Sequence, residues 1–143
     1  MIDDLPSEFE ASDEAAMMAL GARLARRLEG GQIVALSGDL GAGKTTLVRG
    51  MLRGLGYPGR VKSPSYGLVE SYNVAGLEIH HLDLYRLGDP EELDFVGIED
   101  LPGPNSILLI EWPERGKGRL PEAAMHIRIE HSGSGRRAIL TTA

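Results

Sequence analysis

Residues 38–45 constrain the fold more than any other part of the chain. They read G-D-L-G-A-G-K-T, which matches the phosphate-binding P-loop pattern G-x-x-x-x-G-K-[ST] in full. An apolar run typical of a buried strand, residues 32–36, comes before the loop, and residues 46–52 follow it with helical spacing. A strand, a glycine-rich turn and a helix in this order point the positive end of the helix at an anion. The sequence therefore predicts an α/β fold with a nucleotide-phosphate site.

The residue types of this loop suit that chemistry. Glycine lets the backbone turn tightly and brings its N–H groups close to phosphate oxygens. Lys44 would place a cation against the β- and γ-phosphates, and the Thr45 hydroxyl can coordinate Mg²⁺. The alternative is a glycine-rich turn that contains Lys-Thr by chance. The predicted phosphate-binding residues are Gly38, Asp39, Leu40, Gly41, Ala42, Gly43, Lys44, Thr45 and Thr46.

Length and composition limit the remaining choices. The 143 residues suit one domain, and the absence of cysteine excludes disulfides and fits a reducing cytosol. The net charge of −6 argues against a protein that grips RNA through its own surface, so any nucleic-acid contact is expected to run through a partner. No apolar run approaches the roughly 20 residues that span a bilayer, and we expect a cytoplasmic protein without a membrane segment. The four histidines show no ligand pattern for zinc.

The patterns along the chain predict a single compact domain over residues 1–143, with residues 1–11 loosely ordered. Ser12 is expected to cap a first helix, and Asp89 to cap a short one that ends near Gly97. The alternating segments after residue 125 predict a terminal hairpin at the sheet edge. The result is a P-loop NTPase-like mixed β-sheet flanked by helices. The expected helices cover residues 13–28, 46–52 and 90–97, and the expected strands cover residues 32–36, 66–73, 77–85, 106–110, 125–130 and the stretch after 135.

Two carboxylates are candidates for metal binding and catalysis. Glu111 ends the apolar run 106–110, which is the form of a Walker B element, and there it can hold Mg²⁺ or orient the attacking water. The alternative is a solvated glutamate at a strand end. Asp83 lies within an otherwise apolar strand, where a carboxylate is costly unless it binds metal or pairs with a cation such as Arg86.

Two further features leave alternatives open. Trp112, the only tryptophan, follows Glu111 and could stack on adenine or cover the end of the core. Ser63 and Ser65 lie in a polar loop downstream of the P-loop. Their hydroxyls could sense the γ-phosphate as a switch loop, or the segment could be a plain Ser-Pro turn.

Taken together, four blocks in this order resemble the TsaE family of bacterial P-loop ATPases. They are G-D-L-G-A-G-K-T at residues 38–45, S-P-S-Y at 63–66, H-L-D-L-Y-R-L at 81–87 and I-E-W-P-E at 110–114. The last two are specific, and the resemblance covers roughly residues 12–140. One departure is Ser65, where the family usually has threonine. The hydroxyl is retained, so we expect its role to persist.

The resemblance implies that the chain binds ATP or ADP with Mg²⁺ and hydrolyses ATP slowly alone. It also implies that the chain acts with TsaB and TsaD to make threonylcarbamoyladenosine at adenosine 37 of tRNAs that read ANN codons. By this analogy Thr45, Asp83 and Glu111 form the metal and catalytic group together with Lys44, and Trp112 lies close to the nucleotide. Three rivals are a small-molecule kinase with residues 115–119 as a short lid, a GTPase, for which N-K-x-D is missing, and a nucleotide-dependent binding module without meaningful turnover.

Overall fold

A mixed seven-stranded sheet organises the chain, with strand order β1-β7-β6-β2-β5-β4-β3. The computed structural model describes residues 7–39, 43–61, 64, 69–116 and 118–142. The α/β fold class predicted from the sequence is confirmed. The strands are β1 Glu8–Ala11, β2 Ile33–Ser37, β3 Val69–Val74, β4 Leu77–Asp83, β5 Ser106–Glu111, β6 Met125–Ser132 and β7 Gly135–Thr142.

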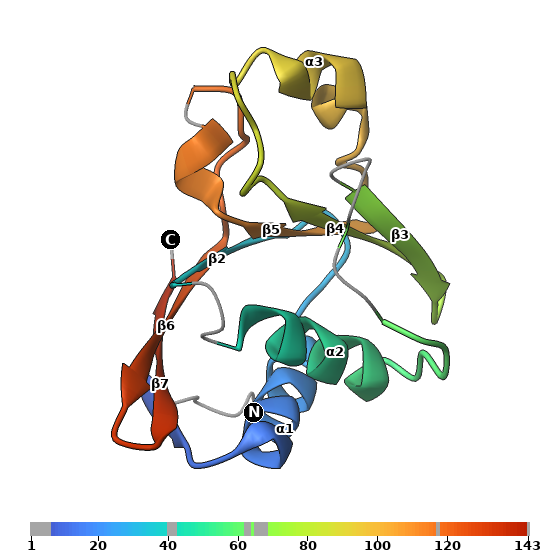
Figure 1. The fold of residues 1–143 in the computed structure, drawn as a ribbon. Helices are drawn as coiled ribbons and strands as arrows, with labels where there is room; N and C mark the ends of the chain where they lie inside the picture. Colours follow the sequence, from blue (N-terminus) through green and yellow to red (C-terminus); the bar gives the residue numbers. More distant parts are fainter. Residues whose placement is uncertain (1–6, 40–42, 62–63, 65–68, 117, 143) are drawn as a thin grey trace.

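Helices cover both faces of this sheet (Figure 1). The helices α1, Glu14–Ala25, and α2, Lys44–Gly54, lie on one face. The short α3, Glu92–Val96, lies on the other face together with two 3-10 turns, Ile98–Asp100 and Pro113–Gly116. The core is accordingly divided into one apolar cluster beneath α1 and α2 and a second beneath α3. None of the described helices is long and apolar enough to cross a membrane.

The four central strands, β6, β2, β5 and β4, run parallel. Their carboxyl ends therefore meet at one edge of the sheet, where ligands bind in open α/β folds. The register pairs Leu36 on β2 with Glu111 on β5, and Glu111 with Asp83 on β4. The P-loop leaves β2 at this edge, so the topology brings both predicted carboxylates beside it.

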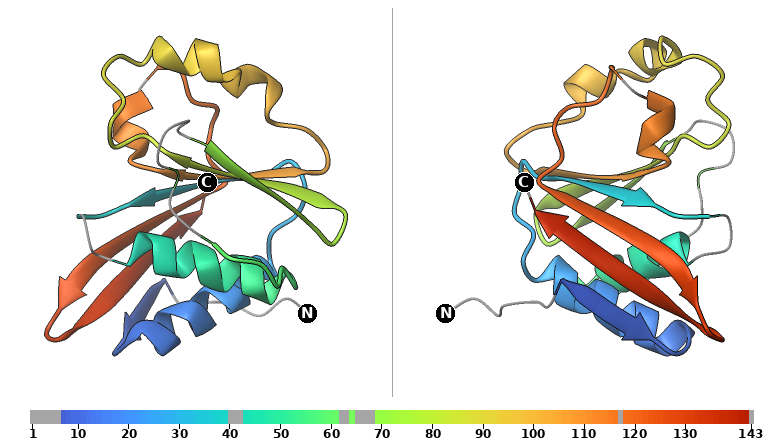
Figure 2. Two further views of the ribbon diagram at one scale, coloured as in Figure 1. Left: turned by 45° about the vertical axis from the view of Figure 1, so that its right-hand side comes forward. Right: turned by 90° about the vertical axis from the view of Figure 1, so that its left-hand side faces the viewer.

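The two ends of the sheet differ from the sequence prediction. The β6–β7 hairpin is not at the edge, because β6 pairs with β2 and β1 covers the outer side of β7 (Figure 2). Residues 8–11 are therefore an ordered edge strand and not a loose tail. The turn at Ala75 and Gly76 does join β3 to β4 in the expected antiparallel hairpin.

The helix boundaries also shift by a few residues. Asp13, and not Ser12, caps α1: its Oδ1 accepts a hydrogen bond from the Ala16 N–H at 2.8 Å. The helix ends at Ala25, three residues before the expected end. Asp89 bonds the Glu91 N–H through its side chain, but α3 begins only at Glu92 because the intervening residues form 3-10 turns.

Glycines let α1 and α2 approach closely. A Cβ added to Gly21 would lie 2.8 Å from the Met51 nitrogen, and one added to Gly50 would lie 2.7 Å from the Met18 Cα. These neighbours are backbone atoms, which cannot rotate away as a side chain can. The close contact fixes α2, and with it the residues that follow the P-loop.

We expect Gly50→Ala to lower the free energy of unfolding by about 2–3 kcal/mol, because the helices must separate to accept the methyl group. Alanine normally favours a helix over glycine, so a loss of stability would identify the steric clash. Denaturant unfolding measures the change. Gly103→Ala is the control, since its Cβ would approach only the Ser106 Oγ, at 3.7 Å. Equal stabilities of the two variants would argue against this packing.

Candidate nucleotide-binding site

The P-loop joins the end of β2 to the start of α2. Gly38 and Gly43 flank its turn with φ of 140° and 109°, in a region that L side chains rarely adopt. A Cβ on Gly43 would also lie 3.3 Å from the Met17 Cε. The flanking glycines therefore have the conformational role predicted for them. Leu40, Gly41 and Ala42 lie outside the described residues, so their phosphate contacts stay predictions.

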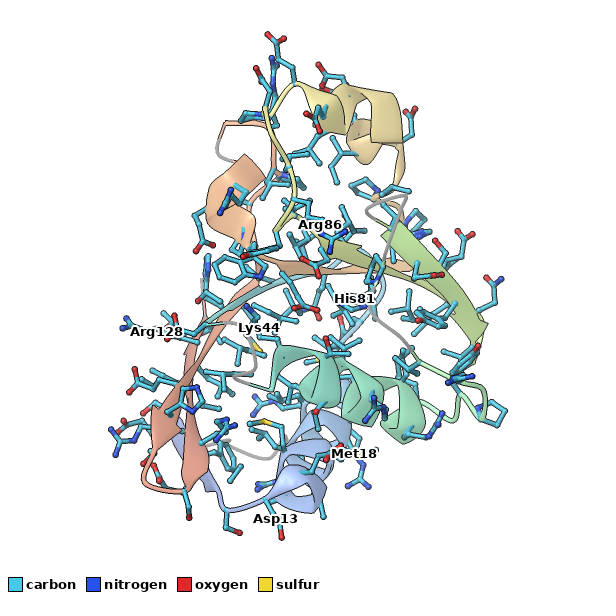
Figure 3. All side chains as sticks on the ribbon, viewed as in Figure 1. Asp13, Met18, Lys44, His81, Arg86 and Arg128 are labelled. Atoms are coloured by element: carbon cyan, nitrogen blue, oxygen red, sulfur yellow. The ribbon has the colours of Figure 1, made fainter. Side chains whose placement is uncertain are left out.

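Lys44 begins α2 and points into the layer between that helix and the sheet (Figure 3). Its side chain is buried, with 4% of the residue exposed. The Nζ donates a hydrogen bond to the Gly38 carbonyl oxygen at 2.5 Å and lies 3.8 Å from the centre of the Trp112 ring. Burial lowers the Lys44 pKa, while the charges of Glu111 and Asp83 act in the opposite direction. A phosphate at this loop would give the buried ammonium an anionic partner.

Asp83 and Glu111 stand opposite each other on neighbouring strands, at the same edge as Lys44. Glu111 is 3% exposed, and its Oε2 lies 3.5 Å from the Thr45 Oγ1, which donates to it. Burial raises the pKa of Asp83, and the charge of Glu111 raises it further, although the Tyr85 N–H bonds the Asp83 carboxylate at 3.1 Å. Two neighbouring carboxylates in a partly buried site favour a bound cation.

The donors fit magnesium. Mg²⁺ prefers oxygen ligands, and in phosphate sites it takes one or two protein carboxylates and completes its shell with phosphate and water. Thr45, Asp83 and Glu111 supply such a set. Within the described part of the chain, no three His, Cys, Asp or Glu side chains group closely enough to hold a metal without such help. A Mg²⁺ ion at this site would need further oxygen ligands, such as phosphate or water.

Arg86 does not neutralise Asp83. No ion pair joins these two described residues, and Arg86 is exposed on the α3 side of the sheet (Figure 3). The alternative explanation for Asp83 in this strand, an ion pair with Arg86, is therefore wrong.

Trp112 lies beside Lys44. Its backbone has a φ of 57°, and its ring packs 5.0 Å from the Tyr85 ring and over the Lys44 ammonium. It also covers the apolar cluster beneath α3. Of the two alternatives, the structure shows the one in which Trp112 covers the end of the core, and the closeness of its ring to a nucleotide stays a prediction.

A cavity of about 530 Å³ lies beside the start of α2. Gly43 and Thr46 line it, whereas Asp83 and Glu111 do not. The other residues that line the cavity could not be predicted from the sequence, because they come from three separate segments of the chain. They include Ser12, Asp13, Met17, Arg49, Ser134 and Arg136.

The contact of His81 with Glu111 was also not predicted from the sequence. The His81 Nε2 lies 2.5 Å from the Glu111 Oε2, and the His81 side chain is fully buried. The spacing of two residues between His81 and Asp83 in a strand puts both on one face, which could have indicated this contact. Ser63 and Ser65, the predicted switch loop, lie outside the described residues.

The raised pKa of Asp83 predicts how the contribution of this residue to stability depends on pH. The carboxyl binds its proton more tightly in the folded protein than in the unfolded chain. The contribution of Asp83 to stability is therefore fully present below the ordinary Asp pKa of 3.8 and is lost as pH rises through the folded-state value. Since the Asp83→Asn variant never becomes charged, we expect its Tm at pH 7 to exceed that of the wild type by about 2–3 °C. Thermal unfolding at pH 7 and at pH 3.5 checks this: an equal gain at both pH values would show that charge is not the cause.

The fold and the site define a P-loop NTPase-like α/β protein. The family model for the threonylcarbamoyl adenosine biosynthesis protein TsaE matches residues 11–139, and the chain belongs to this family. It is 54% identical over 129 residues to the tRNA threonylcarbamoyladenosine biosynthesis protein TsaE of Haemophilus influenzae, a match that covers 87% of this chain and 82% of the relative.

More distant relatives agree with this assignment. The TsaE protein of a Nostoc species is 37% identical over 142 residues, covering 95% of this chain and 85% of its own. A crystal structure of Bacillus subtilis YdiB superimposes with a TM-score of 0.76 at 28% identity, covering 99% of this chain and 87% of that one. The family resemblance drawn from the sequence is therefore confirmed.

Proposed function

We propose that this protein is a Mg²⁺-dependent ATPase for threonylcarbamoyladenosine modification of tRNA at adenosine 37. It would act in the cytoplasm with TsaB and TsaD, hydrolysing ATP to cycle their complex. The observation that carries the ATPase assignment is the convergence of Lys44, Thr45, Asp83 and Glu111 at the carboxyl ends of β2, β4 and β5. The role in tRNA modification rests on the family to which the chain belongs.

Each of these side chains has a separate part in the proposed reaction. Lys44 binds the β- and γ-phosphates and stabilises the charge that grows on their oxygens. Thr45 and the two carboxylates would hold Mg²⁺, which neutralises phosphate charge when bound. Glu111, the more deeply buried carboxylate, is also placed to orient the attacking water. We expect loss of any of these groups to impair turnover more than it impairs folding.

The nucleoside belongs in the cavity beside Gly43 and Thr46. The carboxylates proposed to bind the metal lie by Thr45, whereas Gly43 and Thr46, at the same start of α2, line this cavity. Its volume of about 530 Å³ lies within the range of ordinary small-molecule sites. The missing N-K-x-D element argues against a guanine-specific GTPase.

The described residues give little support to a kinase. Arg115 lies over the Tyr85 ring, and Arg119 forms an ion pair with Glu91 at 3.6 Å. Two of the three cations of the short candidate lid therefore already have partners within the molecule, and the third, Lys117, lies outside the described residues.

We further propose that ATP acts as a switch. The γ-phosphate would order the hydroxyl-rich loop that contains Ser63 and Ser65, and hydrolysis would release it. Because the net charge is −6, tRNA is expected to reach the complex through the partner proteins. Hydrogen exchange of this loop should differ between ADP and a non-hydrolysable ATP analogue; equal exchange would contradict the switch.

The deciding experiment measures phosphate release with Mg²⁺ for this protein alone, and again with the TsaB–TsaD pair and tRNA. We expect slow turnover alone and a strong rise with the pair. Competition with GTP tests the preference for adenine, and EDTA tests the metal requirement. A rate of ATP hydrolysis that does not change when the TsaB–TsaD pair is added would favour a different function. A search for a phosphate acceptor would then follow.

A further inference from the structure

The imidazole of His81 is buried beneath the sheet against Glu111. The His81 side chain lies on the α2 side of β4 (Figure 3). Its Nε2 contacts the Glu111 Oε2 at 2.5 Å, and neither residue is more than 3% exposed. The Nδ1 is buried and has no hydrogen-bond partner among the described residues.

This geometry favours a ring hydrogen on Nε2. A neutral imidazole carries its hydrogen on one of two nitrogens. If Nδ1 carried it, a buried donor would lack a partner, and the bare Nε2 would face a carboxylate oxygen at 2.5 Å. With the hydrogen on Nε2, His81 donates to Glu111, and only the weaker cost of a bare Nδ1 acceptor remains.

The contact also selects one oxygen of the carboxylate. His81 Nε2 and Thr45 Oγ1 both reach Oε2 of Glu111, and no described residue is recorded as a donor to Oε1. A glutamate side chain has three rotatable bonds, so a buried donor on one oxygen strongly limits its orientations. Groups that bind beside metal or catalytic ligands and orient them act in this way in many sites.

We propose that His81 is a positioning residue, which holds Oε2 and so fixes the direction in which Glu111 presents Oε1. This proposal rests on the ATPase function proposed above. His81 itself touches no substrate. Its effect is therefore expected in the rate of the chemical step and not in the affinity for nucleotide.

Two variants separate hydrogen bonding from packing. His81→Leu removes the donor, and we expect kcat for ATP to fall about 10- to 100-fold with KM within about threefold of wild type. His81→Gln keeps an N–H at a similar reach and should restore kcat to within about fivefold of wild type. The matched control is His80→Leu, because His80 faces the other side of the sheet and bonds the Ser71 Oγ at 2.8 Å. Its kcat should not change.

A second measurement does not depend on activity. The ring ¹⁵N spectrum of the wild type, assigned with the His81→Gln variant, should show hydrogen on Nε2 and a bare Nδ1 for His81. Hydrogen on Nδ1 instead of Nε2 would overturn the proposal. Because this spectrum is taken on the wild type, the test holds even when His81→Leu does not fold. A folded His81→Leu protein with wild-type kcat, or a folded His81→Gln protein as impaired as His81→Leu, would overturn it too. Wild-type protein without ATP turnover, alone or with partners, would instead refute the ATPase function and leave the ring spectrum to decide how Glu111 is held.

Discussion

Glu111→Gln is expected to lower the rate of ATP hydrolysis by at least about 100-fold while ADP still binds. The substitution keeps the size of the side chain and an oxygen that can accept from His81. It removes the negative charge that would hold Mg²⁺ and orient water. Because Asp83 then loses a like-charged neighbour, we expect the variant to be at least as stable as the wild type.

The comparison that isolates this charge is Glu114→Gln. Glu114 lies three residues further along the chain and is exposed. Phosphate release under saturating ATP and Mg²⁺ gives the rate, and calorimetric titration gives the affinity for ADP. Full turnover in Glu111→Gln would refute the role assigned to Glu111. Loss of ADP binding would show instead that its main role is to build the pocket.

For Lys44→Ala we expect the Kd for ADP and ATP to rise by about 10- to 100-fold, the equivalent of a charge-assisted hydrogen bond of about 1.5–3 kcal/mol. In the structure the ammonium is enclosed by the Gly38 carbonyl and the Trp112 ring. It is thus held at the phosphate site before any nucleotide arrives, and little ordering is needed on binding. Its removal takes away both the charge and that preparation.

Trp112, as the only tryptophan, supplies the signal for this titration. Nucleotide binding should change its emission, since the Lys44 ammonium lies 3.8 Å from the ring centre. Arg128→Ala is the control for loss of one positive charge, because Arg128 is exposed on β6 and outside the site. An unchanged Kd in Lys44→Ala would mean that the P-loop does not bind the nucleotide here.

Local patterns were sufficient to predict which side chains come together beside the P-loop. The P-loop, its strand and its helix are contiguous, so residues 32–52 carry their own evidence. Glu111 and Asp83 could be predicted because a carboxylate at the end of an apolar strand is a local signal as well. Parallel pairing of β2, β5 and β4 then brings them together, which follows from the fold class.

The features that the sequence did not reveal depend on contacts between distant segments. The strand Glu8–Ala11 is too short to have a pattern of its own and exists by pairing with β7. The cavity beside Gly43 and Thr46 combines the start of α1, the start of α2 and the β6–β7 turn. The His81–Glu111 contact joins residues 30 positions apart. The edge strand and the cavity leave no local periodicity in the sequence, and the alternation in β4 shows only that His81 and Asp83 share a face.

The place of β6 within the sheet has a consequence for the newly made chain. The P-loop strand β2 has its two neighbours in β5 and β6, which begin at Ser106 and Met125. During synthesis, β2 therefore stays unpaired on both sides until the residues of β5 have been added to the chain. Such distant pairing slows folding and leaves apolar strands exposed in the meantime. Chains released before residue 106 would leave both sides of β2 unpaired, and chains released between residues 112 and 124 would pair β2 with β5 alone.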